Sequence, residues 1–191
     1  MRCFAHPREY LGEAFDPFSD EVKASSLSAN EYTQALTILS MHEGEWTLNI
    51  EESSCRGREG ASHIKTRNLV SDADITLPRR GLVEVNSGEL MDEQQKSSFS
   101  AQSRWWYVKK EGFWFADKGV NNVTSPQWRV ELVSVTGDEI RFLRRARIGQ
   151  QSKRRYLALY SLRKFRKQLY IEELVFFNNS LSHKTRWLLS R

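Results

Sequence analysis

The residues of this chain that could take part in acid–base chemistry are few. Two acidic pairs, Glu51-Glu52 and Glu172-Glu173, carry the carboxylates that general acid–base catalysis uses. Both pairs lie in strand-like stretches, where adjacent side chains point to opposite faces. The two carboxylates of each pair are therefore expected to be separated, and neither pair predicts a shared site.

Cys55 is a candidate nucleophile, because its thiol is flanked by Arg56 and Arg58. Neighbouring cations lower the pKa of a thiol and favour the thiolate. The sequence contains no recognisable base partner for Cys55, and it contains no GxSxG, P-loop, Rossmann or HExxH motif. We therefore predict no catalytic residues and favour a protein that is not an enzyme.

The histidines give no sign of a metal site. His6, His42, His63 and His183 are scattered and lack the spacing of metal ligands. We expect them at the surface or in structural contacts, and we predict neither a metal nor a cofactor.

Positive charge is concentrated in the last third of the chain. Residues 129–191 hold 15 Lys and Arg against 5 Asp and Glu, whereas residues 1–128 hold 14 against 19. Arg144, Arg145 and Arg147 are the candidate contacts for an anionic group. Two interpretations of residues 141–167 stay open: a surface that binds RNA or an acidic protein, and a solvated charged face of a sheet.

The stretch RWWYVKKEGFWF, residues 104–115, is the densest aromatic segment. Its pattern predicts a hairpin with two aromatic arms. The candidate wall residues of a ligand cavity are Trp105, Tyr107, Phe113 and Phe115. The alternative is cross-strand aromatic packing that only stabilises the sheet.

The elements that must position these residues are mainly strands. Residues 1–27 are expected to form an extended N-terminal arm, because Pro and Gly interrupt isolated aromatics. Ser28 and Glu31 have the spacing of a capping box, which predicts a helix at about 29–42 that Gly44 terminates. From Trp46 onward the apolar residues alternate, which predicts roughly eight to ten short strands, mostly in adjacent hairpins.

One segment of this strand-rich region is ambiguous, because residues 155–177 fit either two strands or a helix. With that exception, the predicted order of elements favours a single domain over residues 28–191. We expect an antiparallel up-and-down barrel with one helix before its first strand, a sandwich being the alternative.

The triplet Gly44-Glu45-Trp46, at the head of the first strand and after a helix, resembles the signature of lipocalins and other calycin barrels. The resemblance implies that Trp46 closes one end of the barrel and that an arginine of the last strand, here Arg186, packs across its ring. A full helix leading directly into this triplet is similar to the S-type bilin lyases. Those barrels bind a linear tetrapyrrole and help to attach it to an antenna protein.

The cysteines and the hydropathy suggest a compartment. Cys3 and Cys55 are expected to be free thiols, as is typical of a reducing compartment such as the cytoplasm or an organelle stroma or matrix, a disulfide between them being the alternative. No stretch approaches the roughly 18 consecutive apolar residues of a membrane span. We therefore expect a soluble intracellular protein.

Two functional hypotheses follow. The first is a non-enzymatic lipocalin-like barrel that binds a small hydrophobic or acidic amphipathic ligand, such as a bilin, or serves as a binding scaffold. The alternative is a basic subunit that binds RNA or an acidic protein through residues 141–167.

Overall fold

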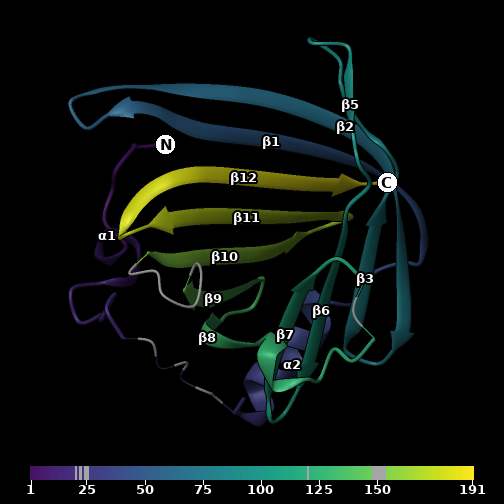
Figure 1. The fold of residues 1–191 in the computed structure, drawn as a ribbon. Helices are drawn as coiled ribbons and strands as arrows, with labels where there is room; N and C mark the ends of the chain where they lie inside the picture. The colour runs from purple at the N-terminus through teal and green to yellow at the C-terminus, as the bar shows by residue number, and fades with distance from the viewer. Residues whose placement is uncertain (20, 22, 24–25, 120, 148–153) are drawn as a thin grey trace.

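The computed structural model describes residues 1–191 except 20, 22, 24–25, 120 and 148–153 (Figure 1). Its helical segments are α1 (Arg8–Leu11), α2 (Ala29–Ile38) and the short 3-10 helix η1 (Pro126–Trp128). Its strands are β1 (Gly44–Arg58), β2 (Ala61–Arg79), β3 (Leu82–Ser87), β4 (Leu90–Asp92), β5 (Ser97–Phe99), β6 (Ser103–Lys109), β7 (Gly112–Asp117), β8 (Arg129–Val135), β9 (Glu139–Arg147), β10 (Arg155–Phe165), β11 (Gln168–Phe177) and β12 (Ser180–Ser190).

Ten of these strands close into one antiparallel barrel (Figure 1). Around the barrel the order is β1, β12, β11, β10, β9, β8, β7, β6, β3 and β2, and β2 pairs back onto β1. The β1–β2 pairing continues to its turn, where Arg58 lies opposite Ala61. The short β4–β5 hairpin is attached to β2 where Val70 lies opposite Met91. The predicted fold class, a mainly β antiparallel barrel with a helix before the first strand, is confirmed.

The two ends of the barrel differ. The turns β2–β3, β6–β7, β8–β9 and β10–β11 lie at one end, which we call the α2 end because α2 packs there. Lys164, near the β10–β11 turn, donates to the carbonyl oxygen of Thr37 in α2 at 3.4 Å. The N–H of Leu27 donates to the carbonyl oxygen of Lys110 in the β6–β7 turn at 2.9 Å. The turns β1–β2 and β11–β12 lie at the opposite end, the open end.

Alternation along the strands decides which side chains form the core. Trp46, Leu48 and Ile50 of β1 are buried inside the barrel, and Ile38 and Leu39 close the α2 end of the same cluster. Complete burial of a large apolar side chain contributes about 1.5–3 kcal/mol. The interior cluster is thus the main source of stability.

Helix α2 begins where the sequence predicts it. The Ser28 hydroxyl accepts the N–H of Glu31 at 3.2 Å, and the Glu31 carboxylate accepts the N–H of Ser28 at 2.7 Å. The predicted end near residue 42 is wrong, because the helix stops at Ile38. The ammonium group of Lys164 donates to the carbonyl oxygens of Thr37 and Ser40 at this end of the helix. The chain then turns into β1.

Gly44 and Trp46 form the joint between the helix and the first strand. Gly44 has φ +107°, a backbone conformation that favours glycine over any residue with a side chain. The indole N–H of Trp46 donates to the carbonyl oxygen of His42 at 2.9 Å. The triplet therefore has a local structural role at the start of β1.

The N-terminal arm lies on the outer face of the barrel. The N–H of Phe4 donates to the carbonyl oxygen of Leu181 at 3.0 Å, and the N–H of Leu181 donates to that of Ala5 at 2.9 Å. The aromatic and leucine side chains of the arm cover an outer apolar patch, which we call the arm patch. It comprises Ala5, Leu143, Leu157, Leu159, Leu174, Phe176 and Leu181, with Tyr10, Leu11 and Phe15 packed against it.

A disulfide between Cys3 and Cys55 fastens this arm to β1. The expectation of two free thiols is therefore wrong. The sequence does not indicate this pairing, because the two cysteines are separated by 52 positions and meet only when the arm packs on the barrel. The cysteines consequently give no support to the reducing compartment that free thiols would have indicated.

Residues 155–177 form two strands, β10 and β11, and the helical alternative is excluded. None of the described helices is long and apolar enough to cross a membrane.

Candidate functional site

Aromatic rings fill much of the barrel interior. Phe142 stacks on Tyr160 with ring centroids 4.8 Å apart, and Phe115 lies 4.6 Å from Tyr160. Trp106 and Trp187 are fully buried in the same cluster. Rings at these spacings pack as in an ordinary protein core. This part of the barrel is filled by its own side chains.

The four predicted wall residues are divided between two faces. Phe113 and Phe115 lie inside the barrel. Trp105 and Tyr107 point outward, into a separate outer cluster. The register explains the division. Tyr107 pairs with Trp114 on the outer face, whereas Val108 and Trp106 pair with Phe113 and Phe115 on the inner face. The structure does not bring the four side chains together as one wall.

Four charged side chains lie inside the barrel toward the open end: Arg104, Asp117, Arg144 and Glu173. Arg104 precedes the inward-facing Trp106 by two positions, so the same alternation turns both inward. Arg104 binds Glu173 at 3.2 Å and Asp117 at 3.4 Å. Asp117 also binds Arg144 at 3.1 Å. The four side chains form a continuous network, which we call the interior charge network.

Arg104 is the centre of this network. The residue is only 7% exposed, and its guanidinium carbon lies 4.0 Å from the ring centroid of Trp187. Burial by itself lowers the pKa of Arg104, but Glu173 and Asp117 outweigh it and raise that pKa overall. The Nη1 atom of Arg104 is buried and has no hydrogen-bond partner within the described residues. The guanidinium is therefore charged and has one donor unused.

Two tyrosines lie beside the interior charge network. Burial, reinforced by the negative charge of Glu173, raises the pKa of Tyr156 to about 12. Burial also raises the pKa of Tyr160 well above its ordinary value, with Glu173 again adding to the effect. Both phenols are therefore neutral at ordinary pH.

These pKa shifts predict a loss of stability in alkali. Tyr156 has an ordinary pKa of 10.0 in the unfolded chain and about 12 in the folded one. The unfolded state therefore loses its proton first, and the free energy of unfolding falls as the pH rises from about 10 to about 12. Urea unfolding across this range, with tyrosinate absorbance as a second reading, measures the effect. Tyr156→Phe should retain more of its stability than the wild type over the same range, and an unchanged loss would contradict the assignment.

A pocket of about 430 Å³ opens at the open end, lined by parts of β1, β2, β11 and β12. We call it the mouth pocket. Glu173 lines it and also binds Arg104, so the pocket and the interior charge network share a residue. The other charged residues of its lining are Glu52, Arg56, Lys65 and Arg67.

The cations of the mouth pocket are only partly neutralised. Arg67 forms an ion pair with Glu52. Arg56 and Lys65 have no ion-pair partner in the part of the chain that the structure describes. Burial, together with the charge of Arg56, lowers the pKa of His183, so this ring is neutral near pH 7. Two unpaired positive charges therefore border the pocket.

The predicted anion contacts do not form one site. Arg144 belongs to the interior charge network. Arg145 lies on the outer face, where it binds Glu131 at 3.1 Å and the carbonyl oxygen of Asp16 at 2.8 Å. The backbone of Arg147 pairs with Arg155, and its side chain lies outside the described part of the structure.

Several basic residues of the segment 141–167 hold the N-terminal arm. Arg141 donates to the carbonyl oxygen of Tyr10 at 3.1 Å, and Arg155 donates to that of Pro17 at 3.4 Å. These side chains are already engaged by the chain itself. Binding of RNA or an acidic protein through residues 141–167 stays a prediction.

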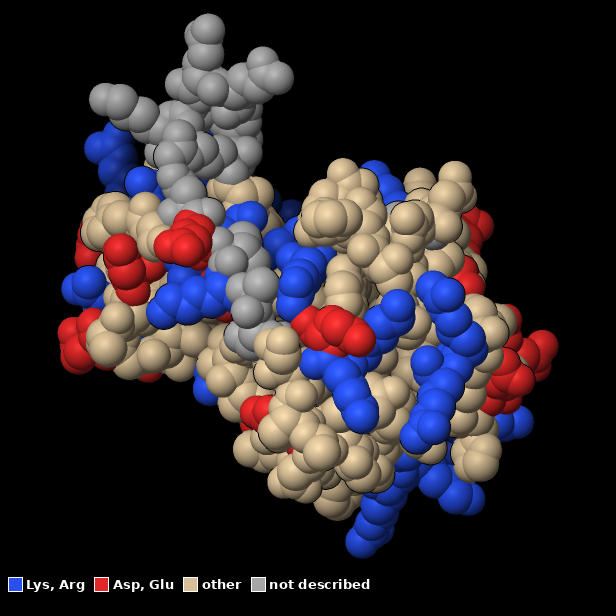
Figure 2. All heavy atoms as spheres, turned by 90° about the horizontal axis from the view of Figure 1, so that it is seen from below, with Lys and Arg blue, Asp and Glu red and all other residues tan. Residues whose placement is uncertain are grey.

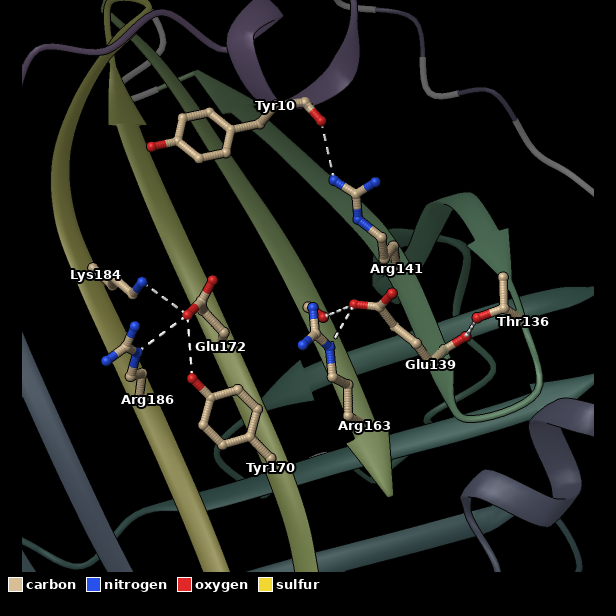
Figure 3. Close-up of polar contacts among 10 residues, drawn as sticks. Tyr10, Thr136, Glu139, Arg141, Arg163, Tyr170, Glu172, Lys184 and Arg186 are labelled. Carbon is tan, nitrogen blue, oxygen red and sulfur yellow. Dashed lines mark hydrogen bonds and ion pairs between the residues drawn. The ribbon is translucent and has the colours of Figure 1, made fainter. Parts of the chain in front are cut away.

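Figure 3 shows a second polar network, on the outer face of β9 to β12. Glu172 binds Lys184 at 2.9 Å, Arg186 at 3.2 Å and the hydroxyl of Tyr170 at 3.2 Å. Burial tends to raise the pKa of Glu172, but Lys184 and Arg186 lower it overall. Because Glu173 faces inward and Glu172 outward, the acidic pair is separated as its spacing predicts.

Arg186 and Trp46 lie on opposite faces of the barrel wall. Arg186 stands opposite Glu51 in the β1–β12 pairing and binds it at 3.2 Å on the outer face. Trp46 is inside, with the core. The implied packing of Arg186 across Trp46 is therefore not formed. The buried arginine–tryptophan contact of this barrel joins Arg104 to Trp187.

Sequence reasoning named Arg144 and Glu173 but missed Arg104 and Asp117, and it placed none of the four in the interior of the barrel. These residues could have been recognised as charged side chains at strand positions whose neighbours two residues away face the interior. Glu173, two positions after the inward-facing Ile171, is an example. Within the described residues, no group of His, Cys, Asp and Glu is arranged to hold a metal ion.

Comparison with known proteins yields little. No protein-family model matches the chain, and no curated protein matches its sequence. The crystal structure of the ywiB protein from Bacillus subtilis is similar with a TM-score of 0.30 and 9% identity, over 76% of this chain and 92% of that chain. This similarity is too low to support an inference about family or function.

Proposed function

We propose that the protein is a non-enzymatic binding protein that holds a small acidic amphipathic ligand at the mouth pocket. The observation that carries the proposal is the pair of cations without an ion-pair partner in the pocket lining, Arg56 and Lys65, with the buried Nη1 group of Arg104 without a hydrogen-bond partner behind the lining residue Glu173. Buried polar atoms in folded proteins nearly always have a partner. Carboxylate and phosphate oxygens are the partners that guanidinium groups bind most strongly.

The charges of the pocket support an anionic ligand. Three cations, Arg56, Lys65 and Arg67, and two carboxylates, Glu52 and Glu173, line it. Arg56 and Lys65 are exposed, so they attract an anion from solution and their attraction weakens as salt rises. An anion that entered would meet Arg56 and Lys65 first and would approach Glu173 and its partner Arg104.

The remaining lining supports a ligand with an apolar part. Val175 and Phe177 provide an apolar side to the pocket. Its volume of about 430 Å³ suits a small molecule, since such sites span roughly 300–1,000 Å³. The packed rings below favour a ligand that stays at the mouth over one that lies deep in the barrel.

The resemblance of Gly44-Glu45-Trp46 to the calycin signature supports the same class of function. Its similarity to the S-type bilin lyases makes a linear tetrapyrrole the narrower hypothesis, because the propionate groups of a bilin would suit the cations of the pocket. Biliverdin is therefore the specific ligand to test after simpler compounds.

The experiment compares two dyes that differ in charge. The fluorescent sulfonate 8-anilinonaphthalene-1-sulfonate carries an anion on an aromatic body, and N-phenyl-1-naphthylamine has the same rings without the sulfonate. We expect the sulfonate to bind about tenfold more tightly or better, which equals about 1.4 kcal/mol. Equal binding of the two dyes would contradict an anion site.

Lys65→Glu locates the site. This variant should weaken binding of the sulfonate about tenfold, because it replaces an attraction by a repulsion at the pocket. The matched control is Lys118→Glu, which makes the same charge change at an exposed position outside the pocket. The control should stay within about twofold of the wild type, because Lys118 is not part of the pocket lining and solvent and salt screen its exposed charge. Equal losses in both variants would show that only the overall charge matters.

A further inference from the structure

The α2 end of the barrel carries a group of basic residues at the tips of its hairpins. Figure 2 views the molecule from the side on which α2 lies in Figure 1, and basic side chains project broadly over this face. The basic residues of the turns at this end are Arg79, Arg80, Lys109, Lys110, Lys164, Arg166 and Lys167. We call them the basic tips.

Among the described residues no carboxylate pairs with the basic tips, although Lys164 already donates to the carbonyl oxygens of Thr37 and Ser40. Arg79 and Lys109 both lie close to the ring of Tyr107, at 4.7 Å and 5.3 Å from its centroid. This shared ring holds the β2–β3 and β6–β7 turns next to each other. The acidic residues at the same hairpin ends are Glu111, Asp138 and Glu139, and Glu139 forms an ion pair with Arg163.

Phe165 projects from the β10–β11 turn at the same end. It is 62% exposed, the highest value among the large hydrophobic side chains of the described residues. Arg166 and Lys167 follow it and are exposed, and the Arg166 guanidinium lies 5.4 Å from its ring centroid. An exposed aromatic ring at a hairpin tip between cations is arranged for contact with another surface.

We propose that the α2 end docks reversibly on an anionic lipid surface, with Phe165 inserted at the headgroup level and the basic tips on the headgroups. Each Lys or Arg near such a surface is attracted by its negative potential, and an inserted aromatic side chain adds apolar burial. Several weak contacts together give stable but reversible attachment. The mouth pocket faces the opposite end and would stay open to solvent in this orientation.

The arrangement favours a membrane over a nucleic acid or a protein. Single-stranded nucleic acids bind to grooves in which successive bases stack on several aromatic rings. Here a single strongly exposed ring stands at a convex tip, and Tyr107 is buried beneath its two cations. The cations come from turns of several separate hairpins, which suits a broad negative surface.

The test is cosedimentation with lipid vesicles. The test compares anionic vesicles of phosphatidylcholine with about 30% phosphatidylserine and neutral vesicles of pure phosphatidylcholine. We expect the wild type to bind the anionic vesicles and to bind the neutral ones at least about tenfold more weakly, with binding lost as salt rises. Equal binding to both, or binding to neither, would overturn the proposal.

Two pairs of variants assign the contact to this end. Phe165→Ser should weaken binding about tenfold, whereas Phe18→Ser, which changes a similarly exposed ring (59%) on the arm, should not. The double variant Arg166→Glu/Lys167→Glu should weaken binding about a hundredfold or more, and Arg58→Glu/Lys118→Glu, at the other end, should weaken it far less. Equal losses within a pair would overturn the assignment. A wild type that binds a single-stranded RNA but no vesicle would assign the basic tips to nucleic acid instead.

Discussion

Replacing Arg104 by methionine is expected to lower the free energy of unfolding by about 3–5 kcal/mol, the range typical when one partner of a buried ion pair is removed. The variant leaves Glu173 without its partner inside the barrel and removes the cation from the face of Trp187. Methionine replaces the aliphatic stem of the arginine but not its guanidinium, so the lost contact with Trp187 adds to the effect of the unpaired charge. Urea unfolding followed by tryptophan fluorescence measures the change.

Two further variants separate charge from packing. Arg186→Met removes an arginine that also binds two carboxylates, but its side chain is 41% exposed, and its loss should cost less than about 1 kcal/mol. Arg104→Met/Glu173→Leu also removes the carboxylate of Glu173, while Asp117 keeps its ion pair with Arg144, so much of the lost stability should return. A double variant as unstable as Arg104→Met alone would show that the uncompensated charge of Glu173 is not the cause.

Opening the disulfide between Cys3 and Cys55 is expected to lower the free energy of unfolding by about 4 kcal/mol. The estimate follows from the entropy that the bond removes from an unfolded loop spanning a sequence separation of 52 residues. Loss of the bond also releases the arm from β1, and the arm patch beneath it then becomes accessible. Calorimetry in the presence and absence of a reductant measures the stability, and proteolysis of the arm reports its release.

The cysteine variants provide an internal check. Cys3→Ser and Cys55→Ser break the same bond, so each should be as destabilising as the double variant. Additive effects would instead mean that each side chain stabilises the fold separately. The wild type under reducing conditions should match the variants.

The parts of the fold that the sequence predicts are local in origin. The capping box needs only Ser28 and Glu31, and the first strand needs only the alternation of Trp46, Leu48 and Ile50. Successive hairpins then leave an up-and-down arrangement as the simplest way to bury one face of every strand. These inferences hold because the interactions join residues that are close in the chain.

The site depends on interactions that the chain order does not reveal. In the arm of the hairpin that contains Trp105 and Trp106, both faces are aromatic, so the sequence could not decide which one faces inward. That choice places Arg104 in the interior and Tyr107 outside. The partner of Arg104 comes from β11, 69 positions away, and only barrel closure brings the two together.

The predictions for the two cysteines and for Arg186 were wrong because both depend on features that the local sequence does not contain. Cys3 reaches Cys55 only after the arm has packed across several strands. The role of Arg186 came from a family resemblance, which transfers a residue type without fixing its phase in the strand. A shift of one position in that phase places a side chain on the other face of the wall.

The β1–β2 hairpin is longer than the barrel that it helps to close. Its pairing with β12 ends where Ser54 lies opposite His183, while β1 and β2 continue together to Arg58 and Ala61. The projecting end is a two-stranded ribbon with open edges, which is a template for adding a strand from another molecule. Arg56 and Arg58 lie on this ribbon, and like charges on two ribbons repel each other. Arg56, which also lines the mouth pocket, thus disfavours edge-to-edge aggregation as well.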